Sequence, residues 1–198
     1  MLKSKYTRIT NFLCGLILAI NFFCYSPSKY RMLSTEDPNG LLMIKDSLIQ
    51  KYGKKESLII SIANAHNSLG ILSMGKKNYE VAINHFSESI SILPNDSIVE
   101  YNKLMAEGHL LFESGNKNNL WDAIEKYSQA TQKHRVTGEP YYHMGLAYKK
   151  LGDKDFDLII ESFNNALTRT LSSQQRAIIE IEKKQVSNRE KKLKNFWK

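Results

Sequence analysis

The sequence has few of the residues that constrain a chain covalently or conformationally. Only two cysteines and four prolines occur among its 198 residues. Both cysteines, Cys14 and Cys24, lie in one apolar stretch, so they cannot build a disulfide framework. The ten glycines are too few for a low-complexity linker protein. With 42% hydrophobic and 24% charged residues, the composition is that of one globular domain.

The sequence also lacks the common signatures of catalysis. It has no phosphate-binding loop and no nucleophile elbow. None of its histidines has the spacing of a metal-binding motif. The histidines are His66, His85, His109, His134 and His143. We therefore expect no catalytic residues, no metal and no cofactor, and we predict that the protein is not an enzyme.

The positive charge is confined to the two ends of the chain. The net charge is +8. Residues 1–31 carry five basic residues and no acid, and residues 183–198 carry seven basic residues and one acid. Subtracting both ends leaves residues 32–182 with a net charge of −3. The body of the protein has no basic groove for a phosphate backbone, so we expect no nucleic-acid partner.

Residues 1–25 have the order of an export signal, with a basic start followed by an apolar run. The run is shorter than the ~20 residues that span a bilayer, although generous bounds extend it to about 17. A retained membrane anchor and a cleaved signal peptide, cut after Ser28, both remain open. In a third alternative, Cys24 is lipidated after cleavage, although the bulky residues before it differ from a bacterial lipobox. In a fourth, the run is a buried helix of a cytosolic domain.

Two segments separate the apolar run from the rest. Residues 26–40 are rich in Ser, Pro, Asp and Gly and are interpreted as a linker. Residues 41–52 carry apolar side chains at helical spacing and end before Gly53. We predict a short leading helix there that packs on the region after residue 57.

One pattern then occurs three times. A glycine is followed by a small or apolar residue, and an aromatic residue comes four positions after that. The first copy has Leu69, Gly70, Ala82, Phe86 and Pro94; the second has Gly108, Ala123, Tyr127 and Ala130; the third has Gly145, Tyr148, Ile159, Phe163 and Ala166. This spacing predicts three helical hairpins. We expect each glycine to let the second helix approach, the small residue to accept that contact, and the aromatic side chain to fill the space toward the next hairpin.

These residues resemble the tetratricopeptide repeat (TPR), whose motif has Leu-Gly, Ala, Phe and Pro in this order. The first copy departs from the motif at His66 and Ser73, where the family has tryptophan and tyrosine. The resemblance implies an all-α, right-handed superhelix of three helical hairpins over residues 41–171. Its repeats cover about 63–96, 101–135 and 138–171.

Residues 172–198 are predicted to form a capping helix and a basic tail. Ser172 and Gln175 have the spacing of a capping box. An apolar stripe that includes Ile179 and Val186 follows on an otherwise charged helix, as the last helix of a repeat array requires. The basic tail is interpreted either as solvated or as a contact for anionic lipid or an acidic partner.

The TPR resemblance also implies a binding groove on the first helix of each hairpin. The corresponding residues are Asn67, Ile71, Met74, Met105, His109, Phe112, Tyr142, Leu146 and Lys149. Their apolar and amide side chains suit a hydrophobic or helical protein segment. Tyr142 and Leu146 stand where a clamp for chaperone tails has cations, so that activity is not implied. The C-terminal helix could itself occupy the groove.

We therefore predict a non-catalytic scaffold that binds a protein or peptide and that is exported or attached to a membrane through residues 1–25. Three repeats are near the minimum for a stable array, so self-association is a further expectation. The bacterial periplasm or envelope is the favoured location. A similar architecture, an N-terminal span before three repeats, occurs in assembly factors for photosystem I, which makes a thylakoid assembly factor one alternative. An envelope lipoprotein with a structural role is the other.

Overall fold

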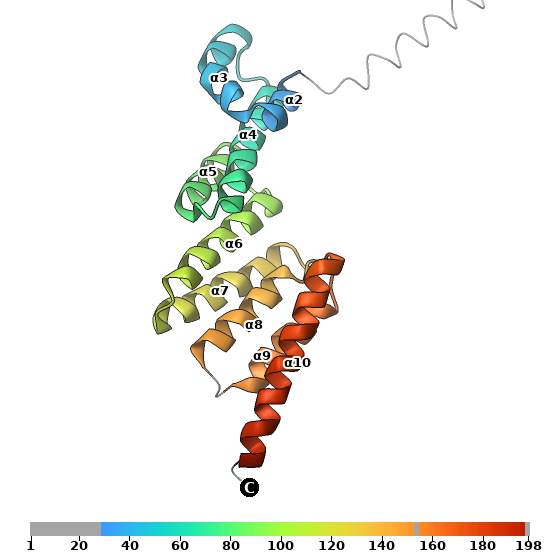
Figure 1. The fold of residues 1–198 in the computed structure, drawn as a ribbon. Coiled ribbons are helices and arrows are strands. Elements are labelled where there is room, and N and C mark those ends of the chain that lie inside the picture. Colours follow the sequence, from blue (N-terminus) through green and yellow to red (C-terminus); the bar gives the residue numbers. More distant parts are fainter. Residues whose placement is uncertain (1–28, 153–154, 197–198) are drawn as a thin grey trace, which may run out of the picture.

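The computed structural model describes residues 29–152 and 155–196, and this part of the chain is entirely helical apart from its connections (Figure 1). The helices are α2 (Lys29–Glu36), α3 (Pro38–Tyr52), α4 (Glu56–Gly75), α5 (Tyr79–Ile92), α6 (Ser97–Ser114), α7 (Lys117–Lys133), α8 (Glu139–Leu151), α9 (Phe156–Leu167) and α10 (Ser173–Phe196). Among these described helices, none combines the length and apolarity needed to cross a bilayer. The predicted signal or anchor, with Cys24, lies outside the described residues.

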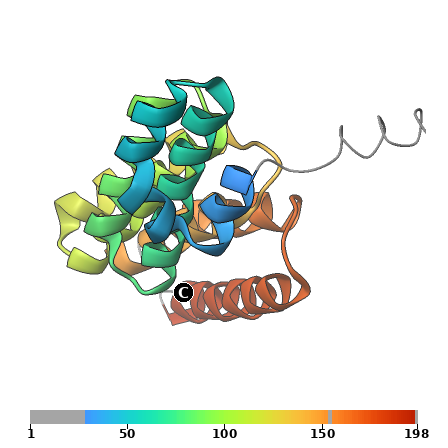
Figure 2. The same ribbon diagram turned by 90° about the horizontal axis from the view of Figure 1, so that it is seen from above.

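Six of the helices form three consecutive hairpins, α4–α5, α6–α7 and α8–α9. Each hairpin packs on the next, through α5 on α6 and through α7 on α8. In both Figure 1 and Figure 2, α10 lies beside the third hairpin, where it packs on α9. This stacking of helical hairpins confirms the predicted all-α, TPR-type fold.

Each hairpin is closed by an aromatic ring that lies directly on a glycine. A Cβ atom added to Gly70 would lie 2.4 Å from the ring of Phe86. At Gly108 and Gly145 the same atom would lie 2.5 Å from the rings of Tyr127 and Phe163. The ring, and not the small residue of the second helix, is therefore the nearest neighbour of the glycine, which corrects our expectation for that small residue. All three rings are fully buried.

Residues 29–36 form α2 and residues 38–40 belong to α3, so the prediction of a linker over 26–40 is wrong for this part. The carboxylate of Asp37 accepts a hydrogen bond from the backbone N–H of Gly40 at 2.9 Å, and Pro38 begins α3. An aspartate cap followed by proline is a typical helix start, which composition alone does not distinguish from a linker. Helix α2 packs on α4 and buries Ser34. The predicted leading helix over 41–52 is part of α3, which also packs on α4.

Helix α10 begins at the predicted capping box. The Ser172 hydroxyl accepts a hydrogen bond from the N–H of Gln175 at 3.1 Å, and the Gln175 side chain accepts one from the N–H of Ser172 at 3.0 Å. Further along, Ile179 and Val186 are buried in one cluster with residues of α9. The helix therefore closes the stack in the position that the first helix of a further hairpin would hold.

Candidate functional site

We use the name inner face for the side of the molecule formed by α4, α6 and α8, the first helices of the three hairpins. The side-chain amide of Asn102 on α6 donates a hydrogen bond to the side-chain oxygen of Asn67 on α4, at 3.1 Å. The rings of His109 on α6 and His143 on α8 have centroids 4.5 Å apart. Polar side chains therefore connect α4 to α6 and α6 to α8 along this face.

The predicted groove residues of the first hairpin lie at an accessible part of α4. Half of the Ile71 surface (50%) is exposed. Asn67 and Met74 are half-buried, and Met74 packs against the apolar clusters of the first and second hairpins. An exposed branched side chain beside half-buried polar and apolar neighbours makes this the open end of the inner face.

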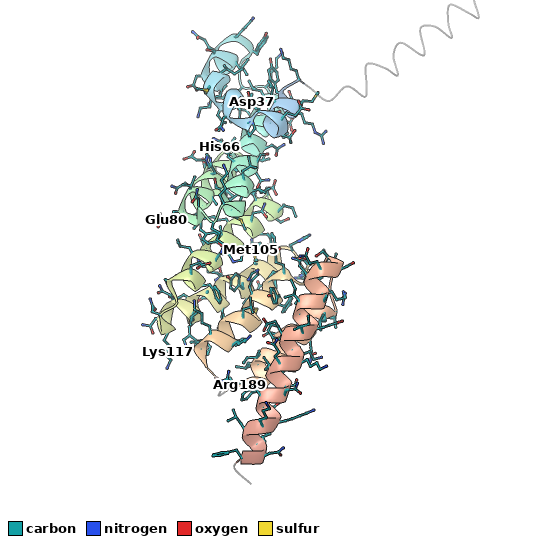
Figure 3. The ribbon with its side chains drawn as sticks, viewed as in Figure 1. Asp37, His66, Glu80, Met105, Lys117 and Arg189 are labelled. Carbon is teal, nitrogen blue, oxygen red and sulfur yellow. The ribbon has the colours of Figure 1, made fainter. Side chains whose placement is uncertain are left out.

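Met105 does not line a groove, contrary to the prediction. It is only 1% exposed and belongs to a buried cluster with Tyr101, Ala123 and Tyr127. Figure 3 shows Met105 in the middle of the stack of helices. Met105 faces the seam between α6 and α7, because Ala123 and Tyr127 of its cluster lie on α7. Phe112, in contrast, is half-buried, and the Lys150 ammonium lies 4.6 Å from the centre of its ring.

In the third hairpin the predicted groove residues face α10. Lys149 forms an ion pair with Glu182 of α10. Tyr142 and Leu146 pack against the cluster that contains Ile179 and Val186 of the same helix. Helix α10 therefore covers the predicted groove only at this end, and Figure 1 shows it far from α4 and α5.

A network of tyrosine and histidine side chains occupies the inner face between α6 and α8. The Tyr127 hydroxyl and His109 Nδ1 are hydrogen-bonded at 2.9 Å. The ring of His143 stacks on that of Tyr127, with a centroid distance of 5.3 Å. The Tyr101 hydroxyl donates a hydrogen bond to Glu139 Oε2 at 3.1 Å. Five side chains from α6, α7 and α8 thus meet at one place.

Burial determines the protonation of this network. It lowers the pKa of His109 to about 4, and burial together with the charge of a protonated His109 lowers the pKa of His143 to about 3. Burial also raises the pKa of Tyr101 and of Tyr127, because a phenolate would lose its hydration there. At neutral pH the two imidazoles are uncharged and both phenols keep their protons.

A second pair of histidines lies in the first hairpin. The Nδ1 atoms of His66 on α4 and His85 on α5 are 3.2 Å apart. Burial lowers the pKa of both imidazoles, and for His66 the neighbouring His85 lowers it further. Among the described residues, nothing bonds the buried Nε2 of His66. The pair is therefore a neutral hydrogen bond that holds α4 to α5.

The structure brings together one set of potential metal ligands that the sequence analysis missed. One ligand atom each from His109, Glu139 and His143 lie within 4.8 Å of one another, and all three residues are half-buried. The ligands come from two helices and are 30 residues apart, so no contiguous motif reveals them. The one signal in the sequence is the four-residue spacing of Glu139 and His143, which places both on one face of a helix.

Two clefts lie elsewhere on the described part of the protein. One of about 460 Å³ between α5, α6 and α7 is lined by paired charges, such as Glu107 with Lys126 at 2.8 Å. The other, of about 410 Å³, is lined mainly by isoleucines of α3, α4 and α5, such as Ile59 and Ile62. Neither gathers groups that would perform catalysis.

Comparison with known proteins gives only distant structural likenesses. No protein-family model matches the chain, and no curated protein matches it significantly. Two solved structures that align with it are residues 41 to the end of MamA from Desulfovibrio magneticus RS-1 and the ArsTM double mutant of MamA RS-1. Each is 16% identical with a TM-score of 0.43, and each match covers 81% of this chain and 94% of that one. The fold assignment rests on the hairpin packing described above.

Proposed function

We propose that the protein is a non-catalytic scaffold that holds a segment of a partner protein against the inner face of α4 and α6. The observation that carries this proposal is the half-exposed Ile71 on that face. An aliphatic side chain that projects from a helical-repeat array is a natural anchor for an apolar residue of an extended or helical segment. Met74 and Phe112, both half-buried, extend the apolar contact to either side.

The amide pair beside this anchor supports binding of a peptide backbone. In the bond between Asn102 and Asn67, one N–H of Asn102 and the oxygen of Asn67 are used. The amide group of Asn67 keeps two donors and the oxygen of Asn102 keeps its acceptor capacity. A peptide that lies across α4 and α6 meets both kinds of group next to an apolar anchor, which is the combination that backbone recognition requires.

Matched substitutions in the first hairpin test this proposal. Ile71 and Val81 are about equally exposed, at 50% and 47%, but Val81 lies on α5, outside the inner face. We expect tagged full-length protein with Ile71→Glu to lose partners that co-purify from native cells, while Val81→Glu keeps them. Thermal unfolding of both variants checks that the fold is intact. Equal loss in both variants, or retention in both, would rule out the inner face as the binding surface.

We also propose that residues 1–25 attach the array to a membrane or direct its export, with the bacterial envelope as the favoured location. The basic start and the apolar run support this. Intact mass and carbonate extraction of the native protein distinguish the alternatives. A full-length chain that resists extraction favours a role in assembling a membrane complex, as in thylakoids, whereas a mature N-terminus at acylated Cys24 favours an envelope lipoprotein. A full-length chain released by carbonate would contradict both.

A further inference from the structure

We propose that His109, Glu139 and His143 bind a divalent transition-metal ion of the Zn²⁺ class, which joins the second hairpin to the third. His109 belongs to α6, whereas Glu139 and His143 belong to α8. An ion held by all three would therefore connect two hairpins through coordinate bonds. The site is separate from the Ile71 surface and does not depend on the proposed scaffold function.

The geometry is close to that of a bound ion. Because the three ligand atoms lie within 4.8 Å of one another, a single point lies within about 2.8 Å of all of them, whereas Zn–N and Zn–O bonds measure about 2.0–2.2 Å. Each ligand needs to move inward by less than about 1 Å, which side-chain rotation supplies. The spacing of Glu139 and His143 is one helical turn, so both side chains project from the same face of α8.

The tyrosines provide the outer hydrogen bonds that metal ligands require. When His109 Nδ1 carries the proton, it donates to the Tyr127 oxygen at 2.9 Å and leaves Nε2 with a lone pair for the ion. The Tyr101 hydroxyl bonds one oxygen of Glu139 at 3.1 Å and so orients the carboxylate. Two of the three ligands therefore already have a partner that fixes their orientation before any ion is bound.

The ligand set selects the class of ion. Two imidazoles and one carboxylate suit Zn²⁺, Co²⁺ or Ni²⁺, whereas Mg²⁺ and Ca²⁺ prefer oxygen ligands throughout. Three protein ligands leave one tetrahedral position for water or for a ligand from another molecule.

Direct binding measurements on full-length protein test the site. Cys14→Ser and Cys24→Ser are present in every variant, because thiolates also bind Zn²⁺. After treatment with EDTA, equilibrium dialysis is expected to give one Zn²⁺ per chain, and Co²⁺ is expected to give the visible absorption of a tetrahedral site. Glu139→Gln and His143→Gln should each weaken Zn²⁺ binding by more than about 100-fold, because loss of an outer partner alone costs 10–100-fold.

A histidine from the other pair provides the matched control. His85→Gln removes one of two imidazoles whose Nδ1 atoms are 3.2 Å apart, outside the proposed site, and should leave Zn²⁺ affinity unchanged. If His85→Gln abolishes binding and Glu139→Gln does not, or if the unaltered site binds no Zn²⁺ below millimolar concentration, the proposal is wrong. Glu139→Gln keeps the test decisive should His143→Gln fail to fold.

The outer hydrogen bond gives a second readout. Tyr101→Phe removes the hydroxyl that holds Glu139 and is expected to lower Zn²⁺ affinity about 10-fold while retaining the one-to-one stoichiometry. Zn²⁺ should also raise the thermal midpoint of the protein with an intact site and not that of Glu139→Gln. A Zn²⁺-induced rise of equal size in both would mean that the ion binds elsewhere.

Discussion

The first and second hairpins are packed in the same way, with one chemical difference. In the first, the ring of Phe86 lies on Gly70, and in the second the ring of Tyr127 lies on Gly108 at nearly the same distance. The ring of Phe86 carries no polar group, whereas the hydroxyl of Tyr127 is hydrogen-bonded to His109 on the inner face. The glycine–aromatic contact carries the packing in both hairpins, and the extra oxygen connects that packing to a polar network in only one of them.

The difference extends to the histidines of the two hairpins. His66 and His85 bond each other within the first hairpin. His109 of the second instead faces His143 of the third, at a ring distance of 4.5 Å. The first pair holds two helices of one hairpin together, whereas the second connects neighbouring hairpins, which is why potential metal ligands from separate repeats meet there.

The strongest way to break the shared contact is Gly108→Leu. Its side chain would occupy the space of the Tyr127 ring, so we expect a loss of at least about 4 kcal/mol in the free energy of unfolding and a disordered middle hairpin. Urea unfolding followed by circular dichroism measures this. Gly75→Leu is the control, because a Cβ at Gly75 would meet no atom within 4 Å. Equal losses at both positions would refute the contact.

Acid should weaken the junction between the second and third hairpins. The folded pKa values of about 4 for His109 and about 3 for His143 lie below the ordinary 6.5, so the unfolded chain binds more protons and stability falls as the pH drops from 6.5 toward 4. For each imidazole this difference corresponds to a loss of roughly 3 kcal/mol in metal-free protein over this window. The charge of Glu113 raises the pKa of His109 and so opposes the effect. Tyr79 and Tyr127, which both contact His109, stay neutral over this pH range.

Thermal unfolding at several pH values checks this prediction. His143→Gln, which removes one of the two titrating imidazoles, should flatten the dependence. A midpoint that is constant between pH 6.5 and 4, or one that rises with acid, would contradict the assignment of two buried neutral imidazoles.

Tyr127→Phe converts the second hairpin to the chemistry of the first. The ring still fills the space over Gly108, but His109 loses its partner, so we expect a cost of about 1 kcal/mol in stability. In a His109→Leu background the same change should cost less, because the bond is already gone. Denaturant unfolding of the four proteins gives the coupling between the two residues, and a coupling of zero would mean that the hydroxyl makes no useful bond.

The smallest expected effect has the opposite sign. Gly75→Ala adds a methyl group where no atom lies within 4 Å, at the last residue of α4. We expect stabilisation of about 0.5 kcal/mol, because alanine loses less backbone freedom on folding. Calorimetry resolves this change, and a destabilised Gly75→Ala would show that the end of α4 is more crowded than this open space indicates.

Local patterns made most of the fold predictable from the sequence. The three glycine–aromatic spacings and the capping box of Ser172 with Gln175 involve residues within one hairpin or one turn, so their contacts follow from helical geometry. The start of α3 was missed because Asp37 and Pro38 occur equally in linkers and at helix starts. For such segments only the packing against α4 distinguishes a helix from a linker.

The candidate site was less predictable, because it depends on how helices are rotated against each other. Met105 and Asn67 hold the same place in the repeat, three residues before the glycine, but Met105 is 1% exposed and Asn67 is half-buried. The meeting of His109 with Glu139 and His143 requires the stacking of two hairpins. The spacing of a repeat does not predict which way a side chain points at the seam between two helices. It also does not predict the register in which neighbouring hairpins stack.

The central claim is that the inner face of the first and second hairpins binds the partner, and site-specific crosslinking tests it most directly. A photoreactive phenylalanine analogue placed at Ile71 and, in a separate protein, at Val81 samples two positions of nearly equal exposure in one hairpin. In native cells we predict a discrete protein adduct from position 71 and none from position 81. The same adduct from both positions, or an adduct from position 81 alone, would contradict the account.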